Sequence, residues 1–366
     1  MTDVLEAPKV EAAEVVPPPP DLPRKLSTTT RSDWLALLGS AVAAVALVWV
    51  VYDRLLPWSG TFGFIVCWFL VFLLIHGIVL AQTHNRAEIA TKLMSTVVHA
   101  GAIVVGGALV MVVVSTVWQG REALGHLNFY TQTMALTGTL APLSSGGVLH
   151  ALVGTLIQVL ITIVITLPLG VLAAVYLNEV GRQGARVVRV VVEAMTALPD
   201  IVSGLFIYVV LLVGLGVDHC GFAAAAALSI NMLPITARAA EVVLRVVPGG
   251  LREAALALGA SQWSTVWRVV LPTARSGLAT ALILGVARGV GETAPLLLNS
   301  GFTTFMHVNP FSGSMVSLPL FIYDMVRTGV PSMVTRAFGA ATILLVLVVL
   351  LFVLTRLIAG KRRRER

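Results

Sequence analysis

An arginine and a glutamate stand four residues apart inside a long apolar stretch near the C-terminal end of the chain. The stretch reads GVARGVGETAPLLL, and its charged residues are Arg288 and Glu292. A charged side chain near the centre of a bilayer costs at least about 2.5–3.5 kcal/mol. Residues four apart lie on one face of a helix, so these two charges can offset each other. Because a guanidinium also presents a fork of donors that fits the oxygens of phosphate, sulfate or carboxylate, the spacing predicts either an oxyanion route or a structural ion pair.

Small and helix-breaking residues surround this pair. Gly285 and Gly289 form a GxxxG pattern, which lets a second helix approach closely. Pro295 cannot donate a hydrogen bond to the carbonyl of Gly291, so we expect the helix to weaken or kink there. Asn231 interrupts another apolar stretch, where its amide can join helices or line the same route. A kink, a freed carbonyl and a charge pair at one depth indicate a lined cavity rather than a lipid-facing surface.

The composition indicates the environment of these residues. Of the 366 residues, 57% are hydrophobic and 12% are charged, against about 25% charged in soluble domains. This excludes a soluble globular enzyme and predicts an all-α, polytopic membrane bundle. The net charge of +7 does not indicate nucleic-acid binding, because the basic residues lie between apolar runs and not in a stripe with aromatic residues. Cys67 and Cys220 provide no disulfide framework and no metal-ligand spacing, so no metal site is predicted.

Eight apolar stretches are long enough to cross a hydrocarbon core, which takes about 20 residues. They cover residues 34–52, 61–81, 94–118, 148–177, 195–216, 222–244, 276–298 and 333–357. If both termini are inside, the inner segments hold 20 of the 25 Lys and Arg residues. This agrees with the excess of positive charge on the cytoplasmic side of membrane proteins. We therefore predict a multi-pass protein with both termini in the cytoplasm.

The two ends of the chain differ from its apolar centre. Residues 1–33 contain PPPP and few large apolar groups, which predicts a disordered cytoplasmic tail. Residues 358–366 are mostly basic and predict a short cytoplasmic tail.

The cytoplasmic connection at residues 245–275 contains a second patterned segment, PGGLREAALALGASQWSTVWRVVLP. Leu251, Ala255 and Leu258 recur at helical spacing, which predicts a short amphipathic helix that ends at Gly259. Small residues on one side of this helix permit close approach to another protein surface.

This connection resembles the EAA loop of type I ABC importer permeases. The matching residues are Glu253, Ala254, Ala255, Gly259, Val269, Leu271 and Pro272. In that family the loop forms a coupling helix that docks on the ATP-binding subunit, so the resemblance implies a coupling role for Glu253, Ala254, Ala255 and Gly259. The alternative is an interfacial helix with no partner. The chain has no GxxxxGK[ST] phosphate-binding loop, so we expect no cofactor in this chain, and ATP and Mg²⁺ bound by a separate ATPase.

The stretch around Arg288 carries a more specific resemblance. It is similar to ARxxGETAPLL, the signature of PstA-type phosphate permeases. Further similar segments are YLNE at 176–179, LPDIVSGL at 198–205, LPI at 233–235 and SLPLFIY at 317–323. Asp200 replaces the small residue usual in the second of these, and we expect it to favour a helix N-terminus. The resemblance covers residues 94–357, with a core at about 148–357, and implies the fold of a type I ABC importer permease.

The front of the chain departs from this family, whose members usually have six spans. Residues 34–93 add two further N-terminal transmembrane helices that carry no recognisable motif. These helices can anchor the chain in lipid, brace a complex or bind a regulator.

The resemblance implies the membrane subunit of an ATP-driven inorganic phosphate importer in the bacterial plasma (inner) membrane. The partners that it implies are a second, homologous permease subunit, a dimer of ATP-binding subunits, an extracytoplasmic phosphate-binding protein, and phosphate. Two alternatives stay open at this point. The cargo can be another oxyanion such as sulfate or molybdate, or the chain can be a non-transporting sensor or scaffold built on a permease core.

Overall fold

The chain is α-helical in a computed structural model that describes residues 31–56, 59–180 and 184–360. No strand occurs among these residues, and seven of their helical stretches are long and apolar enough to span a membrane. The predicted all-α membrane bundle is therefore confirmed. The tail predicted at 1–33 lies outside the described residues as far as residue 30, and so does the basic tail from residue 361 onward.

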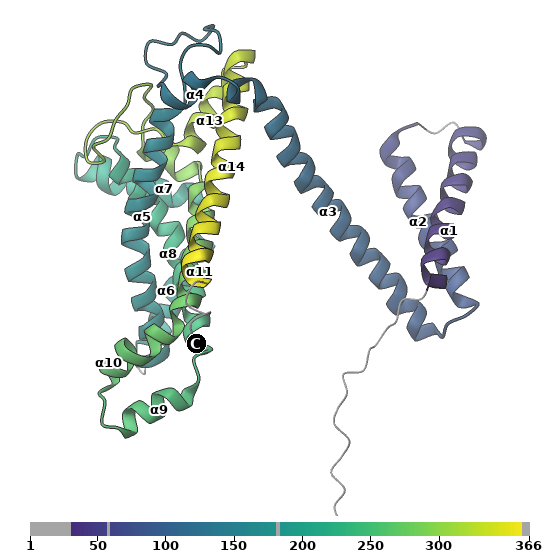
Figure 1. Ribbon diagram of the computed structural model, residues 1–366, viewed down its shortest axis with the longest axis horizontal. Helices are drawn as coiled ribbons and strands as arrows, with labels where there is room; N and C mark the ends of the chain where they lie inside the picture. Colours follow the sequence, from purple (N-terminus) through teal and green to yellow (C-terminus); the bar gives the residue numbers. More distant parts are fainter. Residues whose placement is uncertain (1–30, 57–58, 181–183, 361–366) are drawn as a thin grey trace, which may run out of the picture. The chain divides into compact units, whose positions relative to one another are not determined.

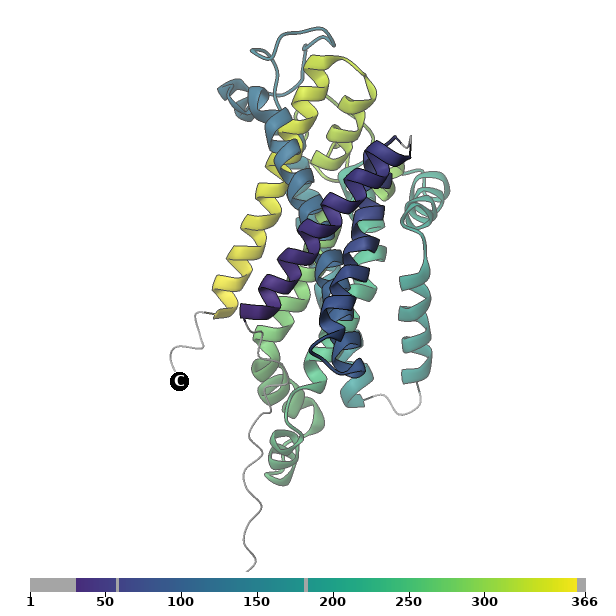
Figure 2. The ribbon, with the colours of Figure 1, turned by 90° about the vertical axis from the view of Figure 1, so that its right-hand side faces the viewer.

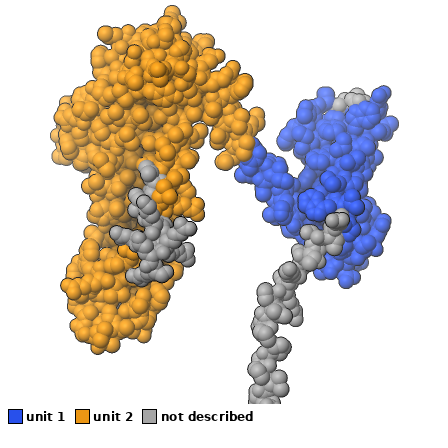
Figure 3. Space-filling view, viewed as in Figure 1, with its two compact units in different colours: residues 1–108 blue, residues 109–366 orange. Residues whose placement is uncertain are grey.

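Two compact units, Met1–Ala108 and Leu109–Arg366, make up the chain (Figure 3). The helices of the first unit are α1 (Arg31–Trp49), the π-helical segment η1 (Val50–Leu55), α2 (Thr61–Ala81) and the first part of α3 (Arg86–Leu124). Lys92 of α3 donates to Asp33 Oδ1 at 2.6 Å and lies 2.8 Å from His84 Nε2. These contacts fasten the start of α3 to the start of α1.

The second unit contains the remaining helices, which Figures 1 and 2 show from two directions. In chain order they are α4 (Leu127–Thr131), α5 (Leu149–Val175), η2 (Tyr176–Val180), α6 (Ala185–Ala197), α7 (Asp200–Ile207), η3 (Tyr208–Gly214), α8 (Gly221–Arg245), α9 (Gly249–Ala257), α10 (Gln262–Thr265), η4 (Val266–Val270), α11 (Leu271–Val290), α12 (Ala294–Asn299), α13 (Leu318–Arg327) and α14 (Pro331–Gly360). Helix α14 starts beside α4 and α13 and runs toward the end of the unit where α9 and α10 lie (Figure 1).

The centre of the second unit is the packing of α8 against α5 and α11. Small residues make this close approach possible, because helices in lipid associate through tight backbone packing. Four alanines of α8 are fully buried: Ala223, Ala224, Ala225 and Ala227. On α5, a Cβ atom added at Gly170 would lie 2.9 Å from Thr236 Cγ2 of α8.

A line of buried polar side chains on α5 joins the helix to its neighbours. Thr155 Oγ1 accepts from the backbone N–H of Leu318 at 2.7 Å, and Gln158 Nε2 donates to the Met315 carbonyl at 2.7 Å. Thr162 Oγ1 donates to the Ala225 carbonyl of α8 at 3.2 Å. These hydrogen bonds hold α5 against its neighbours.

The stretch predicted as a span at 195–216 is not one continuous helix. Helix α6 ends at Ala197, α7 starts at Asp200, and the two halves meet at 105°. Proline lacks the N–H that would continue the helix, and it disfavours helical geometry at the residue before it. Leu198, which precedes Pro199, is accordingly extended, with ψ of 130°. An eighth span is present only if this bent pair is counted as one crossing.

The predicted span at 276–298 is also interrupted. Its helical stretch starts earlier, at Gln262, and ends at Val290. Residues 291–293 leave the helix, and α12 then begins with Pro295 in its first turn. The expected weakening near Pro295 is thus a complete break.

Candidate functional site

Helix α7, which follows the first of these breaks, packs against α12, which follows the second. A Cβ atom added at Gly204 of α7 would lie 2.7 Å from Pro295 Cα of α12, so the two backbones are in direct contact. Asn299 Nδ2 donates to the Gly204 carbonyl at 2.9 Å and to the Pro295 carbonyl at 2.8 Å. Broken helices at membrane depth are tolerated where their backbone groups are satisfied inside the protein or line a cavity. In transporters, such discontinuous helices commonly form the substrate site.

Three charged side chains gather where the breaks meet. Arg288, in the last turn of α11, places Nε 3.6 Å from Glu292 Oε1 and Nη2 3.5 Å from Asp200 Oδ2. The spacing of Arg288 and Glu292 predicted the first contact. Asp200 does start a helix, but its carboxylate also reaches Arg288, which the sequence interpretation missed. The departure from the small residue expected at this position was the available signal.

The arginine of this triad keeps donors free for a ligand. The Arg288 side chain is 53% exposed, whereas Asp200 is 34% and Glu292 17% exposed. Both contacts are longer than the usual 2.7–2.9 Å of a charge-assisted hydrogen bond. A guanidinium has five N–H donors, so the two carboxylates hold Arg288 in position without using up its donors.

Gly285 and Gly289, close to Arg288 in the sequence, allow α11 to pack closely against α8. A Cβ atom added at Gly285 would lie 2.7 Å from Thr236 Oγ1, and one at Gly289 would lie 2.2 Å from Met232 Sδ. Asn231, one residue from Met232, is buried, and its Nδ2 has no hydrogen-bond partner among the described residues. Within those residues no hydrogen bond joins Asn231 to the charged triad, whereas Arg288 and Glu292 contact each other directly.

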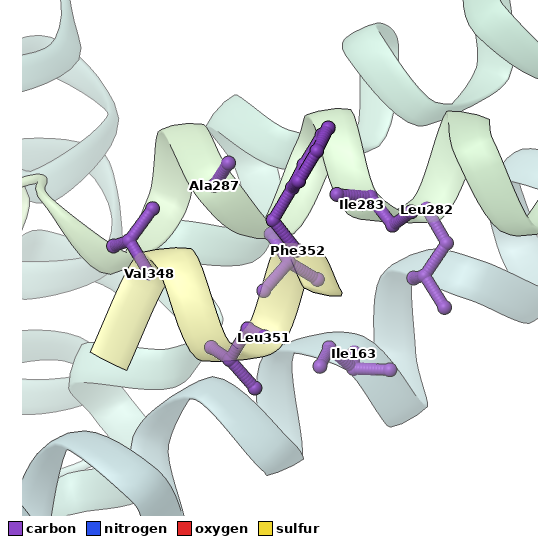
Figure 4. A pocket seen from close by; sticks show the side chains of 8 residues that line it. Ile163, Leu282, Ile283, Ala287, Val348, Leu351 and Phe352 are labelled. Carbon is purple, nitrogen blue, oxygen red and sulfur yellow. The ribbon is translucent and has the colours of Figure 1, made fainter. Parts of the chain in front are cut away.

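A cavity of about 80 Å³ lies between α5, α11 and α14 (Figure 4). The residues that line it are Ile163, Leu282, Ile283, Val286, Ala287, Val348, Leu351 and Phe352. These side chains come from α5, α11 and α14 and are all apolar. An apolar lining provides no donors for an anion, so this cavity is not a candidate oxyanion site.

Toward the end of the unit where α9 lies, a cavity of about 260 Å³ is charged. Arg189 of α6 lies 3.3 Å from Glu241 of α8, which also pairs with Arg245. Arg238 Nη2 of α8 lies 3.4 Å from Glu193 Oε1 of α6. The pairs of Arg189 and Arg238 tie α6 to α8, and all three arginines are about half-exposed, so each pair contributes little stability.

The segment predicted to couple to an ATPase forms α9 and its C-terminal turn. Glu253 and Ala254 are exposed, Ala255 is half-buried, and Gly259 follows the helix with φ of +83°. No atom lies within 4 Å of a Cβ placed at Gly259, so this glycine provides a backbone conformation rather than space. The exposed face of α9 is available to a partner.

An arginine that the sequence interpretation did not single out fixes α9 to the bundle. Arg252 Nη2 lies 2.8 Å from Glu179 Oε1 of η2 and donates to the Leu244 carbonyl of α8 at 2.8 Å. Glu179 is the last residue of the YLNE segment, which the sequence analysis identified as similar to PstA-type permeases. Arg252 was not part of any segment identified in that way.

Comparisons with known proteins agree with these observations. The family described as "Binding-protein-dependent transport system inner membrane component" matches residues 166–364. A protein of Mycobacterium tuberculosis strain H37Rv, named phosphate transport system permease protein PstA 1, is 40% identical over 236 residues, which are 63% of this chain and 77% of that protein. The phosphate transport system permease protein PstA of Haemophilus influenzae is 33% identical over 279 residues, or 75% of this chain and 94% of that protein. A solved structure of the MetNI methionine ABC transporter in inward facing conformations has a TM-score of 0.48 and 25% identity, and covers 60% of this chain and 95% of its own.

Proposed function

Since this chain belongs to the family of binding-protein-dependent transport system inner membrane components, we propose that it is the permease subunit of an ATP-driven inorganic phosphate importer. Two relatives that are 33–40% identical carry the name of phosphate permeases. The observation that carries the proposal within this chain is the half-exposed guanidinium of Arg288, placed where two broken helices meet.

In the proposed pathway, Arg288 meets the anion as it passes the middle of the membrane. Its free N–H groups form hydrogen bonds to the oxygens of phosphate, with a geometry that suits the guanidinium fork. Glu292 and Asp200 compete for the same donors, which keeps the anion from binding too tightly. This matters because a transport site must release its cargo on the other side.

ATP hydrolysis is proposed to take place on a separate chain that docks on α9. Closure of two ATP-binding subunits would move α9, and Arg252 would pass the motion to the ends of α5 and α8. The other proposed partners are a second, homologous permease and an extracytoplasmic phosphate-binding protein. ATP and Mg²⁺ would be bound by the ATPase subunits and not by this chain.

The proposed orientation places α9 and the C-terminus in the cytoplasm of a bacterial cell, with the chain in the plasma (inner) membrane. Supporting this, α14 runs toward the end of the second unit where α9 lies (Figure 1). The abundance of Arg residues on the segments at that end agrees with the positive charge of cytoplasmic loops. An even number of crossings, with the bent pair α6–α7 counted as one, would put the N-terminus there too.

Reconstitution with all partner subunits in proteoliposomes tests the proposal. We expect ATP-dependent uptake of labelled phosphate, with little uptake of sulfate or molybdate. Arg288→Ala should lower the rate of phosphate uptake at least about tenfold, which corresponds to the loss of one charge-assisted hydrogen bond. Arg121→Ala removes an arginine outside the triad and should transport as wild type. Sulfate or molybdate uptake in place of phosphate would identify another oxyanion as cargo, and ATP hydrolysis without any anion movement would favour a sensor or scaffold.

A further inference from the structure

We propose that the charged cavity between α6 and α8 is a binding site for a phosphate group, at the end of the second unit where α9 lies. Two sources offer this group, the headgroup of an anionic phospholipid and free inorganic phosphate, and both present the same kind of oxygens to a guanidinium. The site is separate from the Arg288 triad, because none of its lining residues belongs to that triad. Binding of a phosphate group here does not depend on the proposed cargo.

Helical spacing places the charged side chains of the cavity on two faces. On α8, Arg238, Glu241 and Arg245 follow one another at intervals of three and four residues, which puts them on one face of the helix. On α6, Arg189 and Glu193 are four residues apart and share a face in the same way. Because α6 packs against α8, the two charged faces meet around one cavity.

The cavity has an excess of positive charge. Its lining contains three arginines and two glutamates. Arginine stays protonated in proteins, so the net charge is at least +1, and protonation of either glutamate would only raise it. Arg189 and Arg245 both contact the same atom, Oε1 of Glu241. One carboxylate therefore has to compensate two guanidinium groups, and a further anion would lower the electrostatic energy of the cluster.

The guanidinium groups keep hydrogen-bond donors for such an anion. In each of the three arginines, Nη2 is the atom that contacts a carboxylate. No hydrogen bond from Nε or Nη1 of these arginines occurs in the part of the chain that the structure describes. The arginine side chains are 48–59% exposed, whereas Glu241 is 13% exposed. Glu241 thus lies deeper than the two guanidinium groups that it contacts, and their remaining donors stay accessible.

A phosphate group suits this set of donors. Guanidinium groups bind phosphate oxygens through parallel N–H groups. The cavity volume of about 260 Å³ equals that of roughly eight water molecules in the liquid, which leaves room for a phosphate group and bound water. The other lining residues, Leu177, Val192 and Val242, have apolar side chains and add no acceptor that would compete for the donors.

The surroundings of the cavity make both sources available. Val187, Val190 and Val191 of α6 are 50–65% exposed. A helix with one charged face and one exposed apolar face suits the membrane interface, where phospholipid headgroups lie. Basic cavities between helices on the cytoplasmic side bind anionic headgroups. Free phosphate reaches the same end of the unit when it leaves the proposed pathway, and only this second source rests on the proposed function.

Two substitutions that break the same ion pair separate a binding site from a structural contact. Arg238→Gln removes a positive charge, Glu193→Gln removes a negative charge, and both break the pair between these residues. The two side chains are 48% and 54% exposed, so neither variant leaves a buried charge without a partner. Arg238→Gln should weaken binding of the phosphate group and Glu193→Gln should strengthen it, each by about fivefold, the effect of one unit charge about 4 Å away in water. A pair that only joins α6 to α8 predicts the same effect for both variants.

Binding is measured on the detergent-solubilised complex of this chain with its partner permease and ATPase subunits. In one arm, native mass spectrometry follows the binding of phosphatidylglycerol, with phosphatidylcholine as the zwitterionic comparison. In the other arm, equilibrium dialysis measures labelled inorganic phosphate in an Arg288→Ala background, which removes the contribution of the proposed pathway. Opposite shifts of the two variants in the first arm identify a lipid headgroup as the ligand, and opposite shifts in the second arm identify free phosphate.

Two further variants complete the test. Arg189→Gln leaves Glu241 paired with Arg245 and should weaken binding as Arg238→Gln does, which covers the case in which one variant does not assemble. Arg268→Gln removes an exposed arginine outside the cavity and should match wild type. Equal shifts of Arg238→Gln and Glu193→Gln, or no shift in either arm, would overturn the proposed site. Phosphate uptake by wild-type proteoliposomes tests the proposed function separately, so a failure of one proposal is distinguishable from a failure of the other.

Discussion

Substitution of Arg252 by glutamine should loosen α9 from the membrane helices and weaken the coupling of ATP hydrolysis to transport. The guanidinium of Arg252 contacts three residues, Glu179, Val247 and Leu244. Its Nε lies 3.0 and 3.2 Å from the two carboxylate oxygens of Glu179, and its Nη1 donates to the Val247 carbonyl at 2.8 Å. The third nitrogen, Nη2, donates to the Leu244 carbonyl at the end of α8. Glutamine is shorter and uncharged, so it cannot make this set of contacts.

The burial of the pair sets the size of the effect. The Glu179 side chain is 9% exposed and that of Arg252 is 22% exposed. Loss of one partner from a fully buried ion pair costs about 3–5 kcal/mol, whereas exposed pairs contribute about 0–1 kcal/mol. With Arg252 partly in contact with solvent, we expect a cost between these limits, roughly 2–3 kcal/mol. Such a change would raise the rate of amide hydrogen exchange from locally opened α9 by roughly 30- to 150-fold.

Hydrogen–deuterium exchange of α9 in the assembled complex measures this opening, and the phosphate moved per ATP measures the coupling. Arg245→Gln is the matched control, because Arg245 is 59% exposed and its partner Glu241 keeps a second arginine. We expect that control to change exchange by less than about threefold, as for an exposed pair. Unchanged exchange and coupling in Arg252→Gln would show that the pair does not connect α9 to the bundle.

Two other substitutions probe the framework of the site. Gly204→Ala places a methyl group 2.7 Å from Pro295 Cα. We expect this methyl group to push α7 away from α12, to destabilise the protein by about 1–3 kcal/mol and to reduce phosphate uptake. A lower thermal unfolding midpoint is the measurement that checks the loss of stability. Gly249→Ala, with no atom within 4 Å of the added methyl, should leave that midpoint unchanged. Arg336 is fully buried and donates to the Pro142 carbonyl at 2.7 Å. Arg336→Met should therefore cost about 1.5–3 kcal/mol and speed proteolysis of the loop before α5, and an equally resistant loop would refute this role.

The membrane class and the patterned segments could be predicted from composition and spacing alone. Low charge and repeated apolar stretches predicted the all-α bundle, because a bilayer requires helices whose backbone groups are internally paired. The interval between Arg288 and Glu292 predicted their proximity, and the residues after Pro248 predicted a helix where α9 lies. These features are local, so a few neighbouring residues determine them.

Long-range partners could not be predicted in the same way. Asp200 and Arg288 are 88 positions apart, and Glu179 and Arg252 are 73 apart. Which carboxylate meets which guanidinium depends on how α7 packs on α12 and how α5 packs on α8. Asp200 was visible only as an unusual residue, and Arg252 carried no signal that distinguished it from the other basic residues of the cytoplasmic side.

The prolines show most directly what sequence determined and what tertiary structure decided. Pro168 and Pro234 lie inside the continuous helices α5 and α8, whereas Pro199 and Pro295 lie where helices stop and restart. By itself, each proline determines only that one backbone hydrogen bond is missing. Whether the helix continues depends on the tertiary structure, because α7 and α12, which follow the two breaks, pack on each other through Gly204 and Pro295 and are joined by the amide of Asn299. The sequence thus determined a membrane bundle with a charge pair inside it, and the folded chain decided that two broken helices meet around that pair.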